Sequence, residues 1–348
     1  MEYLSRDARH VVTVVSALES EVRGLETMRP NVNGRVVNVG KDKETMSRLV
    51  QDNDLVVSVL PATMHVPIAK QCILHGRPLV TASYVSAEMQ ALHEDAIQAD
   101  VPILCEMGLD PGMDHMSAMA VIDSVRDEGG KILSFSSLCG GLPAPEVAAD
   151  NPLSYKFSWS PAGVMSAAQN DAKYLQDGKI VQVQGSELLS AARPASVFKT
   201  LNLEVLPNRD SLPYGKIYGI DKTAHTVFRG TLRYGGWSGS MRAFQRRGWF
   251  DSSNCVDEEE LQSEWNRIFQ DDTVPADEVE EHTRSVRECA RFLGSGIASF
   301  NSKNKMEAFS NLLADRLVYG DRERDMVAMH HEFGVELADG TLLCFEGF

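Results

Sequence analysis

The sequence has little of several features that mark specialised classes of protein. Its six cysteines among 348 residues lie far apart and include no Cys-x-x-Cys pair, which excludes a disulfide scaffold and indicates a reducing compartment. No apolar run approaches the roughly 18 residues of a membrane span, and residues 1–10 lack the apolar stretch of a secretory signal. Basic residues number 34 against 49 acidic ones, a net charge of −15, which disfavours nucleic acid and anionic lipid as partners.

What the sequence does contain is an ordinary globular composition, with 43% hydrophobic residues in a chain long enough for two domains. Apolar, β-branched runs typical of buried strands alternate with segments of helical periodicity. The expected strands are 11–15, 35–39, 55–60, 78–81, 101–105 and 131–138, and the expected helices are 43–51, 66–74, 87–97 and 115–125. This alternation predicts a parallel sheet with helices on both faces.

Beyond about Gly140 the sequence becomes rich in proline and glycine, which is typical of loops. A strand is then expected at 179–184 and helices at 258–269, 276–293 and 306–319. Segments 325–333 and 341–345 flank the turn Asp339-Gly340 and predict an antiparallel pair. We therefore expect a nucleotide-binding domain over residues 1–138 and a second α+β domain, for substrate binding and dimerisation, over residues 139–348.

The first domain lacks one expected element. A doubly wound nucleotide-binding sheet opens with a strand, a Gly-rich turn and a helix that holds the pyrophosphate, but no Gly-x-Gly-x-x-Gly occurs near the start. Residues 1–6 are typical of the end of a helix, so that 11–15 is the second strand of such a fold. We expect an α/β protein with a truncated Rossmann-type sheet: a fragment or incomplete gene model of an active enzyme, or a chain of weak activity.

Polar residues follow several of the predicted strands, where parallel sheets bind their ligands. These junctions are Pro61 to His65, Ala82 to Tyr84, Gly108 to Gly112 and Cys139 to Glu146. Any one of them is equally compatible with ordinary turn chemistry. Segments 207–211 and 229–234 are expected to place arginines in short loops, where two guanidinium groups suit bidentate binding of carboxylates.

Seven ordered motifs carry a family resemblance, running from Met1 to about Tyr234. They are Glu2-Tyr3-Leu4-Ser5-Arg6-Asp7, Leu79-Val80-Thr81-Ala82-Ser83-Tyr84, Gly108 to His115, Cys139 to Glu146, Asn151 to Pro161, Pro207-Asn208-Arg209-Asp210-Ser211 and Arg229 to Tyr234. In these motifs the sequence resembles the glutamate-forming saccharopine dehydrogenases, including the dehydrogenase half of the bifunctional aminoadipic semialdehyde synthases.

The resemblance implies an enzyme of lysine metabolism that oxidises saccharopine, a secondary amine, with NAD as cofactor and NADP as the alternative. It implies a homodimer, or one part of a bifunctional chain that also carries lysine-ketoglutarate reductase, in the cytoplasm or the mitochondrial matrix. No metal is implied.

The resemblance also implies site residues. Substrate contacts carry over to Ser83, Tyr84, Arg209, Thr231, Leu232, Arg233 and Tyr234. Cofactor contacts carry over to Leu60, Ala82, Asp110, Ser137, Leu138, Cys139, Trp159, Ser160 and Pro161. Asp110, Cys139 and Tyr84 are the candidates for general acid/base work, and the sequence leaves the choice among them open. Lys156 is a further candidate, with a lysine that merely snorkels beside aromatic residues as the stronger interpretation.

A further departure and two alternatives stand beside this hypothesis. Where the family commonly has an acid that holds the adenosine ribose, this chain has Ala17, with Glu19 and Glu21 nearby. A metal hydrolase built from the histidines is disfavoured, because no Glu accompanies a His-x-x-x-His spacing. An inactive scaffold that still binds saccharopine is the more plausible alternative.

Overall fold

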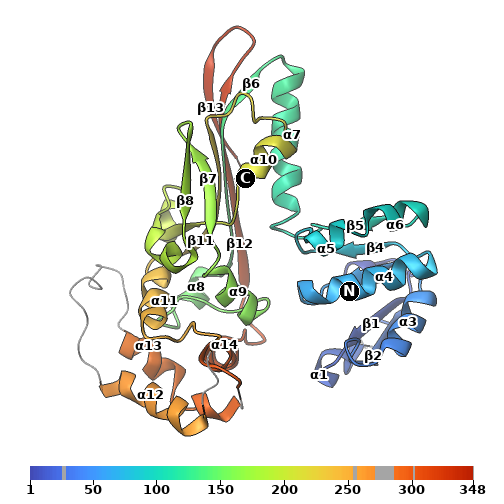
Figure 1. Ribbon diagram of the computed structural model, residues 1–348, viewed down its shortest axis with the longest axis vertical. Helices are drawn as coiled ribbons and strands as arrows, with labels where there is room; N and C mark the ends of the chain where they lie inside the picture. The colour runs from blue at the N-terminus through green and yellow to red at the C-terminus, as the bar shows by residue number, and fades with distance from the viewer. Residues whose placement is uncertain (26–28, 254–256, 271–285, 301, 348) are drawn as a thin grey trace. The chain divides into compact units, whose positions relative to one another are not determined.

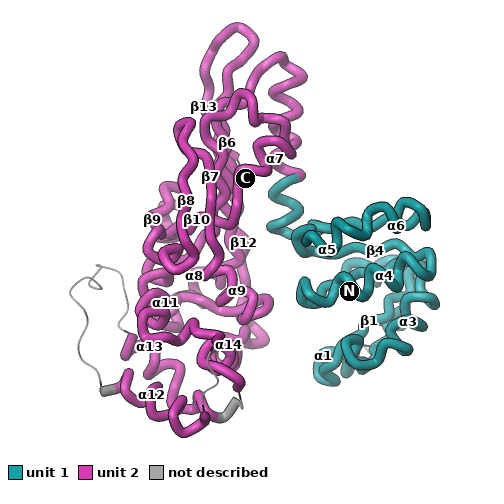
Figure 2. The backbone as a smooth tube through the Cα atoms, in the orientation of Figure 1, with its two compact units in different colours: residues 1–115 teal, residues 116–348 magenta. Residues whose placement is uncertain are grey.

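The computed structural model describes residues 1–25, 29–253, 257–270, 286–300 and 302–347. The chain divides into two compact units, residues 1–115 and 116–348 (Figure 2). Helix α7 (Met113–Asp127) crosses the division. The division lies earlier than the expected boundary after Leu138, because most of α7 and the strand that follows it belong to the core of unit 2.

Unit 1 contains the predicted alternation of helices and parallel strands (Figure 1). Its strands are β1 (Val12–Ser16), β2 (Val32–Val36), β3 (Val56–Ser58), β4 (Leu79–Thr81) and β5 (Ile103–Leu104). Its helices are α1 (Glu19–Val22), α3 (Lys43–Gln51), α4 (His65–His75), α5 (Ala87–Gln90) and α6 (His93–Gln98), with short 3-10 turns at Leu4–Arg6 and Ala62–Met64. The strands form two parallel sheets, β1-β2 and β3-β4-β5. Among the described residues no strand joins β1 to β3, so the expected single sheet is present in two pieces.

Local sequence explains where the helices of unit 1 begin and end. The Asp42 carboxylate accepts the Thr45 N–H at 2.9 Å and caps α3. Helix α4 ends at Gly76, whose φ of +66° suits glycine. Apolar side chains of α3, α4 and α5 then pack with β4 into one core, which comprises Met46, Val50, Ile68, Ala69, Cys72, Leu79, Met89 and Leu92.

Unit 2 is built on an eight-stranded mixed sheet in the order β13-β12-β6-β11-β10-β9, with β7 paired to β11 and β8. The strands are β6 (Lys131–Pro143), β7 (Ala172–Gln176), β8 (Lys179–Val183), β9 (Arg193–Pro194), β10 (Leu203–Pro207), β11 (Thr226–Tyr234), β12 (Asp325–Glu336) and β13 (Leu342–Gly347). The long strand β6 runs parallel to β11 and antiparallel to β12. The predicted terminal pair is confirmed as β12 and β13.

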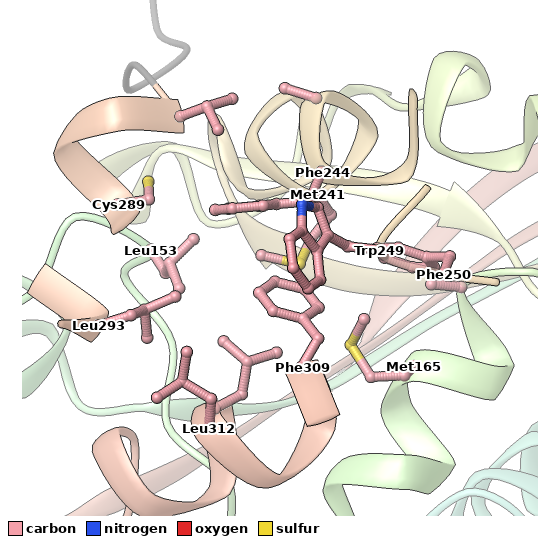
Figure 3. Close-up of a cluster of buried hydrophobic side chains, with 14 of the residues drawn as sticks. Leu153, Met165, Met241, Phe244, Trp249, Phe250, Cys289, Leu293, Phe309 and Leu312 are labelled. Carbon is pink, nitrogen blue, oxygen red and sulfur yellow. The ribbon is translucent and has the colours of Figure 1, made fainter. Parts of the chain in front are cut away.

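Two apolar clusters lie on one face of this sheet. One packs α7 and α10 (Leu212–Ile217) against Phe135, Val227 and Phe333. The other is a helical lobe (Figure 3), which contains Phe244, Trp249, Trp265 and Phe309. The helices of the lobe are α9 (Pro161–Ala167), α11 (Trp237–Arg246), α12 (Glu258–Gln270), α13 (Val286–Leu293) and α14 (Lys305–Arg316); the short α8 (Pro145–Ala148) follows β6. The opposite face carries a third cluster, which includes Leu138, Phe228 and Leu232.

Several sequence-based expectations change in the structure. Residues 229–234 were expected in a short loop, and this was wrong: they form the second half of β11, because aromatic side chains accommodate the arginines in a buried strand. The expected helix 87–97 is divided into α5 and α6. Residues 276–285 of another expected helix lie outside the described residues, and Val286–Leu293 is helical. Among the described residues, no helix is long and apolar enough to cross a membrane.

Candidate functional site

The carboxyl ends of β3, β4 and β5 bring together the predicted site residues of unit 1. These strands are parallel and in register, with Ser58 opposite Thr81, so the residues that follow them meet at one edge of the sheet. Leu60 is half-buried and Ala82 is exposed there.

Tyr84 and Asp110 form a direct pair at this edge. The Tyr84 hydroxyl donates to Oδ1 of Asp110 at 2.6 Å, a short bond of the kind made to charged acceptors. The loop that carries Asp110 is braced, since the buried Asp114 carboxylate accepts the Gly112 N–H at 2.7 Å. Gly112 has a φ of +148°, and a Cβ there would lie 2.2 Å from the Gly108 carbonyl oxygen, so only glycine fits.

A buried histidine connects two serines at the same edge. His65 Nδ1 lies 2.9 Å from the Ser58 hydroxyl, and His65 Nε2 lies 2.9 Å from the Ser83 hydroxyl. Burial lowers the pKa of His65, because the charged imidazolium loses its hydration. Sequence reasoning named His65 as the last residue of the junction that follows the strand 55–60, and as one histidine of a disfavoured metal site, but it gave the residue no role in the proposed chemistry.

The His115 side chain lies close to two carboxylate groups. Its Nε2 lies 3.2 Å from a Glu106 oxygen, and its Nδ1 lies 3.7 Å from Asp114. Glu106 also accepts the Val85 N–H at 3.1 Å, which ties the ends of β4 and β5 together. Within the ranges that the structure describes, no three His, Cys, Asp or Glu side chains are grouped to hold a metal ion.

In unit 2, four predicted site residues share one face of the sheet. Thr231 of β11 pairs with Cys139 of β6, and because strand side chains alternate between faces, Ser137 and Arg233 point to the same side. This stretch lies between the α7/α10 cluster and the helical lobe. The side chains of Leu138, Leu232 and Tyr234 belong to the cluster on the opposite face. On the face that carries Arg233, a ligand could therefore be contacted by Leu138, Leu232 and Tyr234 only through their backbone atoms.

Arg233 is a buried cation that forms no ion pair with any carboxylate of the described residues. The residue is 6% exposed, and its guanidinium carbon lies 5.1 Å from the ring centres of both Tyr155 and Trp237. Nη1 donates to the Leu232 carbonyl at 2.8 Å, whereas the buried Nε has no hydrogen-bond partner. Aromatic faces stabilise a cation only in part, so this group is poised to bind an anion.

Arg209 has a different environment. It is exposed, follows the end of β10 and has a φ of +51°. The pairing of Glu204 with Arg233 and of Pro207 with Gly230 separates Arg209 from Arg233 by more than three ladder positions, roughly 10 Å. The two guanidinium groups therefore start from distant backbone positions, and a ligand held by both must extend along β11.

The remaining predicted residues lie at the start of α9. Ser160 caps this helix by accepting the Gly163 N–H at 3.2 Å, and Pro161 is its first residue. Trp159 is 51% exposed. Lys156, the further acid/base candidate, donates to Glu323 at 2.6 Å and to the Val318 carbonyl at 3.1 Å. Those bonds give Lys156 a structural role in joining two segments of unit 2.

Comparison with known proteins supplies two family models and several relatives. The model described as the saccharopine dehydrogenase NADP binding domain matches residues 1–104, and the saccharopine dehydrogenase C-terminal domain matches residues 108–346. The chain is 37% identical to the mitochondrial alpha-aminoadipic semialdehyde synthase of Mus musculus, over 98% of this chain and 38% of that protein. It thus spans less than half the length of this relative.

Shorter relatives match over most of their length. The chain is 34% identical to saccharopine dehydrogenase [NADP(+), L-glutamate-forming] of Schizosaccharomyces pombe, over 98% of this chain and 79% of that protein. A solved structure of apo saccharopine dehydrogenase (L-Glu forming) from Saccharomyces cerevisiae aligns with a TM-score of 0.79 at 33% identity, covering 100% of this chain and 82% of that one. The α/β fold with a nucleotide-binding domain followed by a second domain is thereby confirmed.

Proposed function

The chain belongs to the saccharopine dehydrogenase family, and from this premise we propose that it oxidises the secondary amine saccharopine with NADP⁺. A hydride leaves the lysine-side carbon of the secondary amine, and water splits the resulting imine into glutamate, which keeps the nitrogen, and aminoadipate semialdehyde, which keeps the oxidised carbon. NADP⁺, when bound, accepts that hydride. The chain's own residues bind the carboxylates, orient the amine and move protons.

The observation that carries this proposal is the buried guanidinium of Arg233. A cation removed from water is costly unless an anion pairs with it, and Arg233 has only a backbone carbonyl and two aromatic rings. A substrate carboxylate would supply the missing charge and the partner for Nε. The exposed Arg209 is proposed to bind a second carboxylate of the same extended molecule.

We assign proton transfer to Asp110, Tyr84 and Cys139. The 2.6 Å bond from Tyr84 to Asp110 allows a proton to pass between phenol and carboxylate, and it keeps the carboxylate oriented. Cys139 is 4% exposed and pairs across the sheet with Thr231, two positions from Arg233 on the same face. Ser83 is proposed to contact the substrate through its hydroxyl.

The cofactor is proposed to be NADP⁺ rather than the NAD expected from the sequence. The family model is described as NADP-binding, and the Schizosaccharomyces pombe relative is named for NADP. The same choice is supported by Ala17, which follows β1 and cannot accept a ribose hydroxyl, and by the exposed side chain of Arg23 beyond α1, which pairs with Glu19 at 2.8 Å. No described residue is assigned to the pyrophosphate, and the nicotinamide half is assigned to Leu60, Ala82, Asp110, Ser137 to Cys139 and Trp159 to Pro161.

The test is saccharopine-dependent formation of NADPH by the full chain, followed by absorbance. Asp110→Asn should lower kcat at least about 100-fold, as loss of a general acid or base does, while Tyr84→Phe lowers it less. Turnover with NAD⁺ at the same efficiency contradicts the cofactor choice. Saccharopine binding in calorimetry without turnover supports the alternative of a binding subunit, and absence of binding contradicts the proposal. The implied homodimer stays a prediction that sedimentation equilibrium would check.

A further inference from the structure

Ser58, His65 and Ser83 form a hydrogen-bonded row at the edge of β3 and β4, and the proposed chemistry gives no role to Ser58 or His65. His65 and Ser58 are each 3% exposed, while Ser83 is half-buried. The three residues come from the end of β3, the start of α4 and the turn after β4. The row therefore runs from the interior of unit 1 to the substrate contact proposed above.

A backbone hydrogen bond holds the main chain of Ser83 in place, but this bond does not orient the Ser83 hydroxyl. The Ser83 carbonyl accepts the Glu106 N–H at 3.1 Å. The hydroxyl rotates about the Cα–Cβ and Cβ–Oγ bonds unless a partner holds it, and among the described residues its hydrogen-bond partner is His65 Nε2 at 2.9 Å. Losing that contact would leave several hydroxyl orientations to be ordered again when a ligand binds.

We propose that His65 is a positioning residue, whose ring fixes the direction in which Ser83 presents its hydroxyl to the substrate. This inference rests on the proposed function of Ser83 as a substrate contact. The second bond, from Nδ1 to Ser58 at 2.9 Å, sets the ring plane, since both ring nitrogens are then held at opposite sides.

The tautomer of His65 determines what Ser83 offers. A neutral imidazole has one N–H and one lone pair. If Nε2 accepts from Ser83, the serine presents lone pairs and receives a hydrogen bond from an amine or ammonium. If Nε2 donates to Ser83, the serine presents its own O–H and binds a carboxylate. The lowered pKa keeps the ring in the neutral form that this selection requires.

Two substitutions distinguish the contributions of the two ring nitrogens of His65. In His65→Asn the amide reaches the position of Nδ1 and retains Ser58, whereas in His65→Gln it reaches the position of Nε2 and retains Ser83. We expect His65→Asn to raise the Kd of saccharopine about three- to tenfold, the loss expected for one neutral hydrogen bond. We expect His65→Gln to stay within about twofold of the unsubstituted chain.

A double-mutant cycle then tests whether His65 acts through Ser83. Ser83→Ala should weaken saccharopine binding in the unsubstituted chain and add less than about twofold in the His65→Asn background. The matched control is His75→Asn at the far end of the same helix, which removes a 2.8 Å bond between His75 Nε2 and the Ser47 hydroxyl. This control should leave the Kd unchanged.

Nitrogen NMR of the histidine side chains gives a readout that a merely structural role would not move. His65 should show one neutral tautomer, and Ser83→Ala should alter the Nε2 signal more than the Nδ1 signal. Unaltered saccharopine binding by His65→Asn, or by Ser83→Ala, overturns the proposal. A chain that forms NADPH from saccharopine under those outcomes still supports the proposed function, and an unsubstituted chain that fails to bind saccharopine contradicts both.

Discussion

At the scale of single residues, Arg233 is a proposed binding group whose burial lowers the stability of the folded chain. The guanidinium is buried in unit 2 beside two aromatic rings, and no acidic side chain in the described part of the chain pairs with it. The folded chain tolerates the desolvation because the planar group stacks on Tyr155 and Trp237. Selection for stability alone would favour an apolar side chain of similar length, so the arginine indicates a ligand.

Arg233→Met should separate binding from stability. We expect the free energy of unfolding to stay equal or to rise, because replacing a buried unpaired charge by an apolar side chain removes a desolvation cost. The Kd of saccharopine should rise at least about tenfold, the loss typical of a hydrogen bond to a charged group. Calorimetry and urea unfolding measure the two quantities. The control is Arg193→Met, which removes a guanidinium stacked 4.9 Å over Phe228 on the opposite face and should not alter binding.

Cys72 predicts a pH dependence of stability. Burial in the core of unit 1 raises the pKa of this thiol from 9.0 to about 11. Because the unfolded thiol ionises first, stability is complete below about pH 9 and is lost as the pH rises towards 11, by about 2 kcal/mol. Cys72→Ala should lose less stability than the unsubstituted chain between neutral pH and about pH 11. Equal losses in urea unfolding would contradict the burial effect.

At the scale of elements, β6 and β11 approach so closely that one glycine is required between them. A Cβ on Gly140 would lie 2.8 Å from both Cβ and the carbonyl oxygen of Leu232, whereas a Cβ on Gly141 would meet nothing closer than Ser158 at 4.0 Å. Gly140→Ala should therefore cost about 1–3 kcal/mol of unfolding free energy, and Gly141→Ala should stay within about 0.5 kcal/mol. Thermal unfolding of the two variants tests this, and equal effects would contradict the close approach.

Periodicity was sufficient to predict most elements of unit 1. The helix expected at 43–51 is α3 residue for residue, because an Asp cap and an amphipathic face define it locally. The strand expected at 35–39 begins at Val32 instead, because its limits are set by pairing with β1, where Val12 lies opposite Val32. Pairing is a long-range property, which local sequence does not contain.

The candidate site was predictable only where it depended on strand ends or on family motifs. Ser83, Tyr84 and Asp110 were found because parallel strands end at a common edge. The contact of Arg233 with Tyr155 joins segments nearly 80 residues apart, and the burial of this side chain runs against the usual expectation that arginine is exposed. The bonds of His65 likewise require three segments to be folded together.

At the scale of the whole molecule, each unit has cores of its own. The clusters that contain Phe309, Phe135 and Leu138 lie entirely in unit 2, and the cluster around Cys72 lies entirely in unit 1. A compact region that contains its own apolar cores meets the physical condition for independent folding.

Residues 113–348, produced without residues 1–112, should therefore fold. The cut keeps all of α7, whose residues Ala118, Ile122 and Val125 complete the core beside Phe135, whereas a start at residue 131 removes that helix and exposes the core. We expect the longer fragment to unfold cooperatively in calorimetry and the shorter one to bind a hydrophobic dye and unfold without a transition. Cooperative unfolding of the shorter fragment would show that β6 and the residues after it fold without α7, and would contradict the assignment of α7 to the core of unit 2.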